Sequence, residues 1–286
     1  MTGEELYLFN SRDQTESDRL NTQHKVLAGF MGYKLLHPSI DLSGKGALRV
    51  ADVGTGTGIW LKELSPFLQS FPDGRSHYLH GFDISNDQFP VDTNDISFST
   101  HDSTKCFPEE HLNSYDIVHL RLLVLALPEP DIRKVMENVV QLLRPGGYLQ
   151  WEDTDWCYTG PDRPAPTITK ILDMVVEYSI QVGFSMRISE CLMDQGKRLD
   201  LQSLNRFVYD TLENPECYTD VKSWFSQLLR ALLPVTLIRT GQAANESVAQ
   251  ALTCRMLEDV ESEYSQGVIP RFRMMAVVGR RTSESV

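Results

Sequence analysis

Short apolar runs and helical periodicities alternate along the first half of the chain. Apolar residues recur every three or four positions over about 60–68 and 130–143, which predicts two amphipathic helices. Five short stretches are typical of strands, at about 48–53, 78–83, 96–100, 116–120 and 148–152. Because strands that alternate with helices favour a parallel sheet, the pattern predicts an α/β fold with a Rossmann-like, doubly wound core.

The pattern changes after residue 156. Pro161, Pro164 and Pro166 indicate a loop, and helical periodicities follow over about 167–182 and 187–198. We interpret residues 156–203 as a helical cap inserted over the ligand end of the sheet. Two more strands and two more helices are predicted at about 204–209, 272–278, 219–233 and 245–263.

The 286 residues are enough for one large domain, and we expect a single domain over 1–286 with a seven-stranded, mostly parallel sheet. A helical segment within residues 1–47 precedes the first strand and is interpreted as a lid. Residues 48–155 form the predicted cofactor-binding core, and 204–286 supply the C-terminal strands and helices.

A glycine-rich turn, Asp52–Gly58 (DVGTGTG), joins the first predicted strand to a helix. Such a turn lets a ligand approach the backbone closely, and the free N–H groups of the helix N-terminus point at it. The third glycine comes one residue too early for the dinucleotide fingerprint G-x-G-x-x-G, and Asp52 suits a cationic ligand better than a pyrophosphate. The turn resembles motif I of class I S-adenosylmethionine (SAM) methyltransferases, which implies SAM as the cofactor.

Polar residues stand where the next predicted strands end, and open α/β sheets bind ligands at these ends. Asp83 ends the second strand and is placed to accept hydrogen bonds from both ribose hydroxyls. Asp102 and Ser103 follow the third strand, near the expected adenine amino group, and His119 ends the fourth, beside the methionine part of SAM. The alternatives are a turn residue at Asp83, a helix cap or turn residue at Asp102, and a packed or surface histidine at His119.

Six segments, taken together, are similar to one family: Arg19-Leu20-Asn21 with Gln23-His24, His37-Pro38, Ala51–Trp60, Asp83-Ile84-Ser85 with Gln88-Phe89-Pro90, Tyr115–Arg121 and Leu143–Tyr148. Over roughly half of the chain they resemble fungal secondary-metabolism methyltransferases, the group that includes gliotoxin-type N-methyltransferases and LaeA-like proteins. The resemblance implies that the N-terminal segment folds over the cofactor. The candidate cofactor-binding residues are therefore Tyr7, Arg19, Asn21, Asp52, Gly54, Thr55, Gly56, Gly58, Asp83, Ile84, Asp102, Ser103 and His119.

Methyl transfer from SAM needs an acceptor held in line with the S–CH3 bond and the exclusion of water. A neutral alcohol, phenol or amide acceptor must also lose a proton, and the candidate bases are His24, His119 and Glu152. An apolar setting between two tryptophans is expected to raise the pKa of Glu152; the alternative is a structural or exposed acid.

Substrate choice should reside in residues 156–270, which carry no recognisable motif. Trp151, Trp156 and Tyr158 are candidates for an apolar substrate wall or, equally, for core residues, and Arg121 is a further substrate-binding candidate. Glu152, Asp153 and Asp155 form an acidic cluster of the kind that can bind Mg²⁺. Because alternate acids after a strand are usually solvated, we expect no metal.

Three function classes follow: an N- or O-methyltransferase of small secondary metabolites, a LepI-like pericyclase that uses SAM as a fixed positive charge, and a LaeA-like regulator. The net charge of −12 disfavours nucleic acid as a partner. No apolar run approaches the ~20 residues of a membrane span. Five scattered cysteines and the absence of a secretory signal favour a cytoplasmic protein. We expect a monomer or a homodimer.

Overall fold

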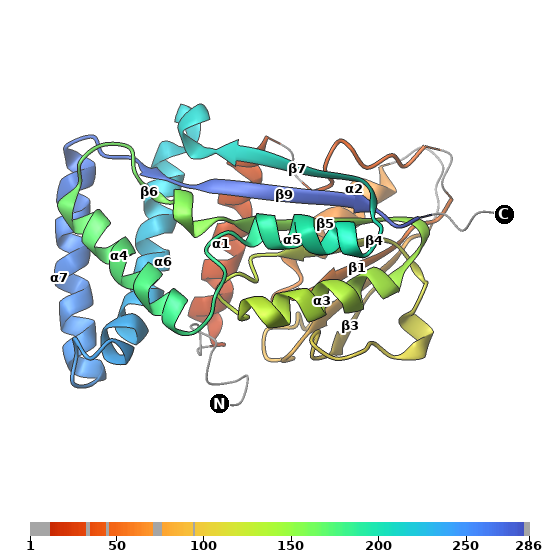
Figure 1. Ribbon diagram of the computed structural model, residues 1–286, viewed down its shortest axis with the longest axis horizontal. Helices are drawn as coiled ribbons and strands as arrows, with labels where there is room; N and C mark the ends of the chain where they lie inside the picture. Colours follow the sequence, from red (N-terminus) through yellow and green to blue (C-terminus); the bar gives the residue numbers. More distant parts are fainter. Residues whose placement is uncertain (1–11, 33–34, 44–45, 71–75, 94, 283–286) are drawn as a thin grey trace.

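The computed structural model describes residues 12–32, 35–43, 46–70, 76–93 and 95–282. Its centre is a seven-stranded sheet in the order β3-β2-β1-β4-β5-β9-β7 (Figure 1). The strands are β1 (Arg49–Val53), β2 (Tyr78–Asp83), β3 (Ile96–Thr100), β4 (Tyr115–Arg121), β5 (Leu143–Thr154), β7 (Gln202–Asp210) and β9 (Arg273–Arg280). Only β9 runs against the others, since it pairs antiparallel with both β5 and β7. The predicted seven-stranded, mostly parallel sheet is confirmed.

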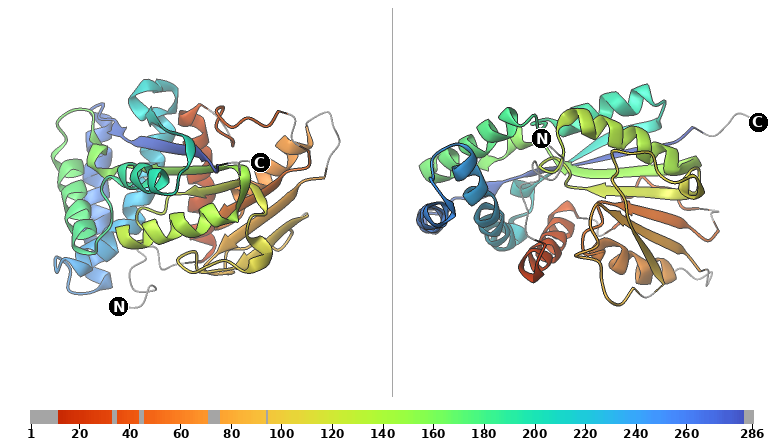
Figure 2. Two further views of the ribbon diagram at one scale, coloured as in Figure 1. Left: turned by 45° about the vertical axis from the view of Figure 1, so that its right-hand side comes forward. Right: turned by 90° about the horizontal axis from the view of Figure 1, so that it is seen from below.

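Helices cover both faces of this sheet. They are α1 (Gln14–Met31), α2 (Ile59–Gln69), α3 (Glu129–Leu142), α4 (Pro166–Gln181), α5 (Ile188–Arg198), α6 (Tyr218–Arg239) and α7 (Glu246–Ser265). Seen along the sheet in Figure 2 (right), red α1 and orange α2 lie on one side, and yellow-green α3 and teal α5 on the other. The short strands β6 (Gly160–Pro161) and β8 (Pro270–Arg271) pair separately.

The two faces of the sheet carry separate cores because strand side chains alternate between faces. Val50 and Ile117 pack with the α2 side chains, Trp60 and Leu64 among them. Val118 and Leu120, one residue out of phase with Ile117, pack on the other face in the larger core that includes α3. No helix among the described residues is both long and apolar enough to cross a bilayer.

The helices expected to form a cap take two different positions. Helix α5 packs on α3 and on the outer strands, so it belongs to a face of the sheet. Helices α4, α6 and α7 pack against one another beyond the ends of the strands (Figure 1). The cavity at these ends is lined from α6 and not from α4 or α5. Of residues 156–203, Trp156 borders the cavity, whereas helix α6, which also borders it, lies later in the chain; the division into lid, core and cap stays a prediction.

Candidate active site

A cavity of about 870 Å³ lies at the carboxyl ends of β1, β2 and β4. Its polar half is bordered by the glycine turn and by the residues that follow β2 and β3. Its apolar half is bordered by the loop Leu122–Leu127, by Trp156, by Trp224 and Leu228 of α6, and by Phe272. Helix α1 contributes Arg19, Leu20, Gln23 and His24 to the wall. A concave site of this size, part polar and part apolar, suits small-molecule ligands.

The glycine turn needs its glycines for two reasons. Gly54, Gly56 and Gly58 have φ angles of 73°, 52° and 68°, a left-handed region that favours glycine. A Cβ on Gly58 would lie 2.7 Å from the ring of Phe98, so Gly58 serves packing. Gly54, Thr55 and Gly56 border the cavity, whereas Gly58 does not. The sequence prediction of Gly58 as a cofactor contact is not supported by this placement.

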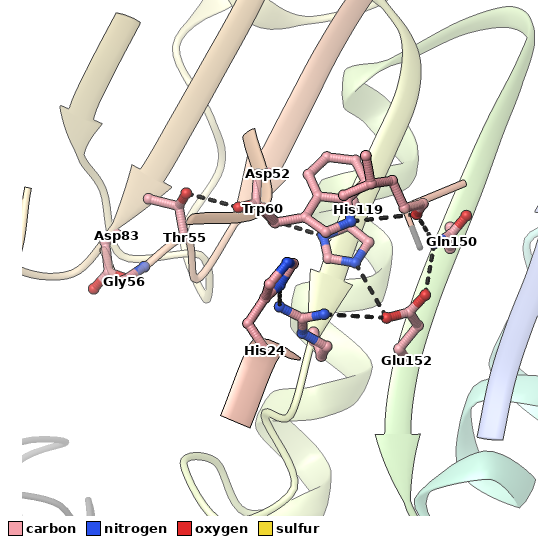
Figure 3. Close-up of polar contacts among 11 residues, drawn as sticks. His24, Asp52, Thr55, Gly56, Trp60, Asp83, His119, Gln150 and Glu152 are labelled. Atoms are coloured by element: carbon pink, nitrogen blue, oxygen red, sulfur yellow. Dashed lines mark hydrogen bonds and ion pairs between the residues drawn. The ribbon is translucent and has the colours of Figure 1, made fainter. Parts of the chain in front are cut away.

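The strand-end acids lie at the polar half. Oδ2 of Asp83 accepts a hydrogen bond from the Gly56 N–H at 2.8 Å, as Figure 3 shows. Burial raises the pKa of Asp83 above its ordinary value, against the effect of that hydrogen bond. Asp102 uses only Oδ1 within the described residues, to accept two hydrogen bonds from Thr104. Burial acts to raise the pKa of Asp102, but the bonds from Thr104 outweigh it and the pKa is lowered.

Two neighbours of these acids also border the cavity. Ile84 follows Asp83 with 58% of its side chain exposed, which leaves an apolar surface for a flat ring. The Ser103 carbonyl accepts a hydrogen bond from Asn138 at 2.9 Å. The predicted residues after β2 and β3 are thus brought together around one space.

Helix α1 is fastened to the glycine turn. Asn21 Oδ1 accepts a hydrogen bond from the Thr57 hydroxyl at 2.7 Å, and Asn21 itself does not border the cavity. Arg19 does border it, with Nε and Nη2 donating to Glu16 at 2.7 and 2.6 Å. Of the three N-terminal residues that the resemblance implied, Arg19 faces the cavity, Asn21 positions the helix, and Tyr7 lies outside the described residues.

His119 occupies the centre of the cavity wall between two carboxylates. Nδ1 lies 2.7 Å from Asp52 Oδ1, and Nε2 lies 3.6 Å from Glu152 Oε2 (Figure 3). The ring stacks on Trp60 with centroids 3.8 Å apart and is almost fully buried. Burial by itself lowers the pKa of His119, but the contacts with Asp52 and Glu152 prevail and raise it. The two flanking carboxylates therefore favour the protonated form of the ring, which makes it a poorer base.

The two carboxylates beside His119 extend the network in opposite directions. Asp52 Oδ2 accepts a hydrogen bond from the Thr55 hydroxyl at 2.7 Å, which fixes the glycine turn. Glu152 Oε1 accepts one from Gln150 Nε2 at 2.7 Å. Glu152 does not border the cavity, so it reaches a ligand only through His119 or Arg121. Its predicted role as a base in contact with substrate is not supported.

The remaining base candidate, His24, is also engaged. Arg121 Nη2 donates to His24 Nδ1 at 2.6 Å, and His24 Nε2 lies 3.0 Å from Glu63 Oε2. Burial, and then the nearby positive charge of Arg121, lower the pKa of His24. A neutral ring that accepts at Nδ1 carries its proton on Nε2. Both nitrogens are therefore in use, and no predicted base presents a free lone pair to the cavity.

The aromatic residues after β5 divide between wall, core and surface. Trp156 borders the cavity, as expected. Trp151 is fully buried and donates from Nε1 to Asp153 Oδ2 at 3.2 Å, on the opposite strand face from Glu152. Tyr158 is 38% exposed and lies under the guanidinium of Arg273 at 4.9 Å. Neither Trp151 nor Tyr158 borders the cavity, and Trp151 lies in the core, which is the alternative that the sequence left open. Their role as substrate contacts stays a prediction.

The remaining apolar wall residues, Trp224, Leu228 and Phe272, are not predicted by any sequence motif. Trp224 packs on Phe272 with ring centroids 4.8 Å apart, and Leu228 lies one turn further along α6. The helical periodicity over 219–233 predicted the helix but did not indicate what its apolar side faces. The apolar periodicity could not show which residues of α6 face the cavity, because α6 also packs against α1, α4 and α7.

The acidic cluster after β5 is used internally. Asp153 accepts hydrogen bonds from the N–H groups of Leu123 and Thr154, and burial raises its pKa to about 7. Asp155 accepts from the N–H and hydroxyl of Ser189 at 2.9 and 2.6 Å. Over the described residues, no three His, Cys, Asp or Glu side chains are grouped to hold a metal ion.

Comparison with known proteins agrees with this geometry. The model of the family described as "Methyltransferase domain" matches residues 51–149, which contain the glycine turn, Asp83, Asp102 and His119. The methyltransferase grgD of a Penicillium species is 29% identical over 91% of this chain and 92% of its own length. The chain thus carries a methyltransferase domain over these residues, and the matches support a class I SAM-dependent methyltransferase. This methyltransferase is also 30% identical to the N-methyltransferase gliN of Aspergillus fumigatus, over 60% of this chain and 59% of gliN.

The fold of this methyltransferase has counterparts among solved structures. Loganic acid methyltransferase with S-adenosylhomocysteine (SAH) superposes with a TM-score of 0.54 at 11% identity, over 98% of this chain and 97% of that one. At that identity the likeness shows the fold alone. The cavity lies at the carboxyl ends of the strands, the edge at which open α/β sheets bind their ligands.

Proposed function

We propose that the chain methylates a nitrogen of a small, largely apolar metabolite. The observation that carries this proposal is a cavity in which a polar half at the glycine turn adjoins an apolar half under α6. A SAM-sized ligand fills the polar half, and a flat or branched apolar acceptor fits beside it. The relatives gliN and tcpN, which are named N-methyltransferases, support nitrogen over oxygen.

The residues of the polar half fit SAM. Asp83 is a buried carboxylate at the cavity edge, suited to two ribose hydroxyls, and Oδ2 of Asp102 is free of the Thr104 contacts that occupy Oδ1. Ile84 offers its exposed side chain to the adenine ring. Arg19, charged and at the cavity wall, suits the methionine carboxylate. When bound, SAM supplies a methyl group already activated by its positive sulfur.

The chain's own contribution is positioning and the exclusion of water. His119, as an imidazolium between Asp52 and Glu152, holds the glycine turn and β5 together. His24 has both nitrogens engaged. Without a free base, the acceptor must bring its own lone pair, which an amine nitrogen does and a phenol does only after ionising. The apolar half desolvates that nitrogen and keeps it uncharged.

The test is incubation of the purified chain with SAM and a panel of hydrophobic secondary amines, matched phenols and matched carboxylic acids. We expect SAH and a product heavier by one methylene, from amines and with a rate that rises with pH as the amine loses its proton. Asp83→Ala serves as the variant with impaired cofactor binding, and Arg133→Gln, on the surface of α3, as the control. Turnover with unchanged SAM would indicate a pericyclase, and methylation of phenols alone would contradict the proposal.

A further inference from the structure

We propose that Arg121 is a receptor for a neutral acyl oxygen of the acceptor, as in an amide, ester or ketone. The inference rests on the proposed function, because it assigns the acceptor to the apolar half of the cavity. Arg121 ends β4 and borders the cavity, directly before the loop Leu122–Leu127 that forms the apolar wall. A guanidinium at this position is a strong donor group next to apolar surface.

The fork of Arg121 is oriented from two sides and only partly used. Nη2 donates to His24 Nδ1 at 2.6 Å, on α1. Nη1 lies 3.8 Å from Glu152 Oε2, on β5, which is too long for a hydrogen bond. A guanidinium has five N–H groups, and within the described part of the chain this is its single hydrogen bond. The side chain is 14% exposed and lines the cavity, so its other donors are accessible to a ligand there.

Donors held in a mostly dry place gain most from an acceptor that the ligand supplies. The planar fork matches the two lone pairs of an sp² oxygen. The same geometry explains why His24 is engaged: as an acceptor it steers Nη2, which leaves the rest of the fork turned toward the cavity. His24 is a positioning residue in this arrangement and does not need to exchange a proton.

The local charge favours a neutral oxygen over a carboxylate. Arg121 and the imidazolium of His119 face two carboxylates, Asp52 and Glu152, within the same network. His24 is the neutral member of the group, and its partner Glu63 is 41% exposed to solvent. Two acidic side chains already lie in this network, so a carboxylate brought into the apolar half would add a further negative charge close to them. A carbonyl accepts the same hydrogen bonds without that cost.

An alternative use of Arg121 would be to bind the methionine carboxylate of SAM. The test separates the two uses with SAH, which has that carboxylate, and 5′-methylthioadenosine, which lacks it. We expect Arg121→Gln to leave the affinities for both nucleosides within about twofold of wild type. A selective loss of SAH affinity in Arg121→Gln would overturn the proposal, because the carboxylate of the cofactor would then be the partner.

The acceptor site is probed in the SAH-loaded protein by NMR titration with benzamide, benzoate and benzylamine. We expect benzamide to bind most tightly of the three, and Arg121→Gln to weaken it roughly 10- to 100-fold, the range of a hydrogen bond to a charged group. Arg121→Lys keeps the charge but loses the fork and should weaken benzamide nearly as much. Arg133→Gln removes a surface charge and should change nothing.

Several outcomes contradict the inference. Benzamide affinity that is equal in wild type and Arg121→Gln overturns it, as does tighter binding of benzoate or benzylamine than of benzamide. If Arg121→Gln does not fold, the order of the affinities of the wild type for benzamide, benzoate and benzylamine still tests the inference. Failure of the wild type to bind SAH would instead overturn the proposed function, so the two failures are distinguishable.

Discussion

The two halves of the cavity are built in different ways. The polar half comes from the glycine turn and the residues after β2 and β3, which are positioned by backbone turns and strand ends. The apolar half combines the loop after β4 with Trp156, Trp224 and Phe272, which lie far apart in sequence and meet only in the folded chain. The residues expected to bind the cofactor are thus positioned by their neighbours in sequence, whereas the position of the acceptor residues depends on how distant helices pack.

The largest expected effect is on the polar half, from Gly56→Arg. Gly56 has φ of 52°, and a Cβ there would approach Leu20 to 3.4 Å, so the longer side chain must enter the cavity. We expect no detectable SAH binding by calorimetry. Gly241 has φ of 73° and no atom within 4 Å of a built Cβ, which makes Gly241→Arg the matched control for backbone strain. SAH binding by Gly56→Arg, or its loss in Gly241→Arg, would contradict the assignment.

A smaller loss is expected from Asp83→Ala. The substitution removes a buried acceptor at the cavity edge and should weaken SAH binding by about 1–3 kcal/mol, the scale of hydrogen bonds from a charged group. Calorimetry measures the affinity, and circular dichroism checks the fold. Asp194→Ala on α5, where the carboxyl is 66% exposed, is the control for loss of one negative charge. Equal affinities in the two variants would show that Asp83 does not hold the ribose.

In the apolar half, Leu228→Ala should weaken binding of the acceptor and leave binding of SAH unchanged. Leu228 borders the cavity from α6. We expect SAH affinity within about twofold of wild type, while KM for the acceptor rises by about 1–2 kcal/mol, roughly five- to thirtyfold, for the lost apolar contact. Leu237→Ala removes a buried leucine from the same helix away from the cavity and should leave KM unchanged. A fall in SAH affinity for Leu228→Ala would show that the apolar half also contributes to cofactor binding, and would contradict the division into two halves.

The smallest expected effect is a pH dependence that comes from His119 and its contacts with Asp52 and Glu152. The pKa of His119 is raised by Asp52 and Glu152 against burial, so the stabilisation is complete below the ordinary pKa of about 6.5 and is lost as pH rises through the raised value. We expect the free energy of unfolding of the wild type to fall on the alkaline side, by at most about 1.4 kcal/mol per pH unit, and the melting temperature and SAH affinity to fall with it. His119→Gln should lower both at neutral pH and flatten this decline.

His80 on β2 offers the control for that experiment. It lies between the Tyr78 and Ser99 hydroxyls, and burial lowers its pKa to about 4. It stays neutral throughout the alkaline range, so His80→Gln should keep the alkaline decline of the wild type. The stability that depends on neutral His80 is instead lost on acidification, between about pH 6.5 and 4. If the melting temperature and SAH affinity of His119→Gln still fall at alkaline pH, a titrating group other than His119 causes the decline.

The sequence predicted the elements and the polar half well for one physical reason. Strand ends and glycine turns depend on neighbouring residues, so Asp83 and Asp102 could be placed from the pattern alone. Trp151 was harder, because both faces of β5 are buried and the alternation of side chains does not reveal which face meets a ligand. Trp224 and Phe272 could not be placed at all, since their meeting depends on how α6 docks against β9 and its neighbours.

The position of β9 has a consequence for how the molecule assembles. It follows every other described strand in the chain, yet it pairs with β5 on one side and β7 on the other. During synthesis, β1 to β5 can associate as soon as they emerge, but β7 has no partner until β9 inserts between them. Such late, long-range pairing is slow. The strands beneath the glycine turn can therefore associate before the outer part of the sheet is complete.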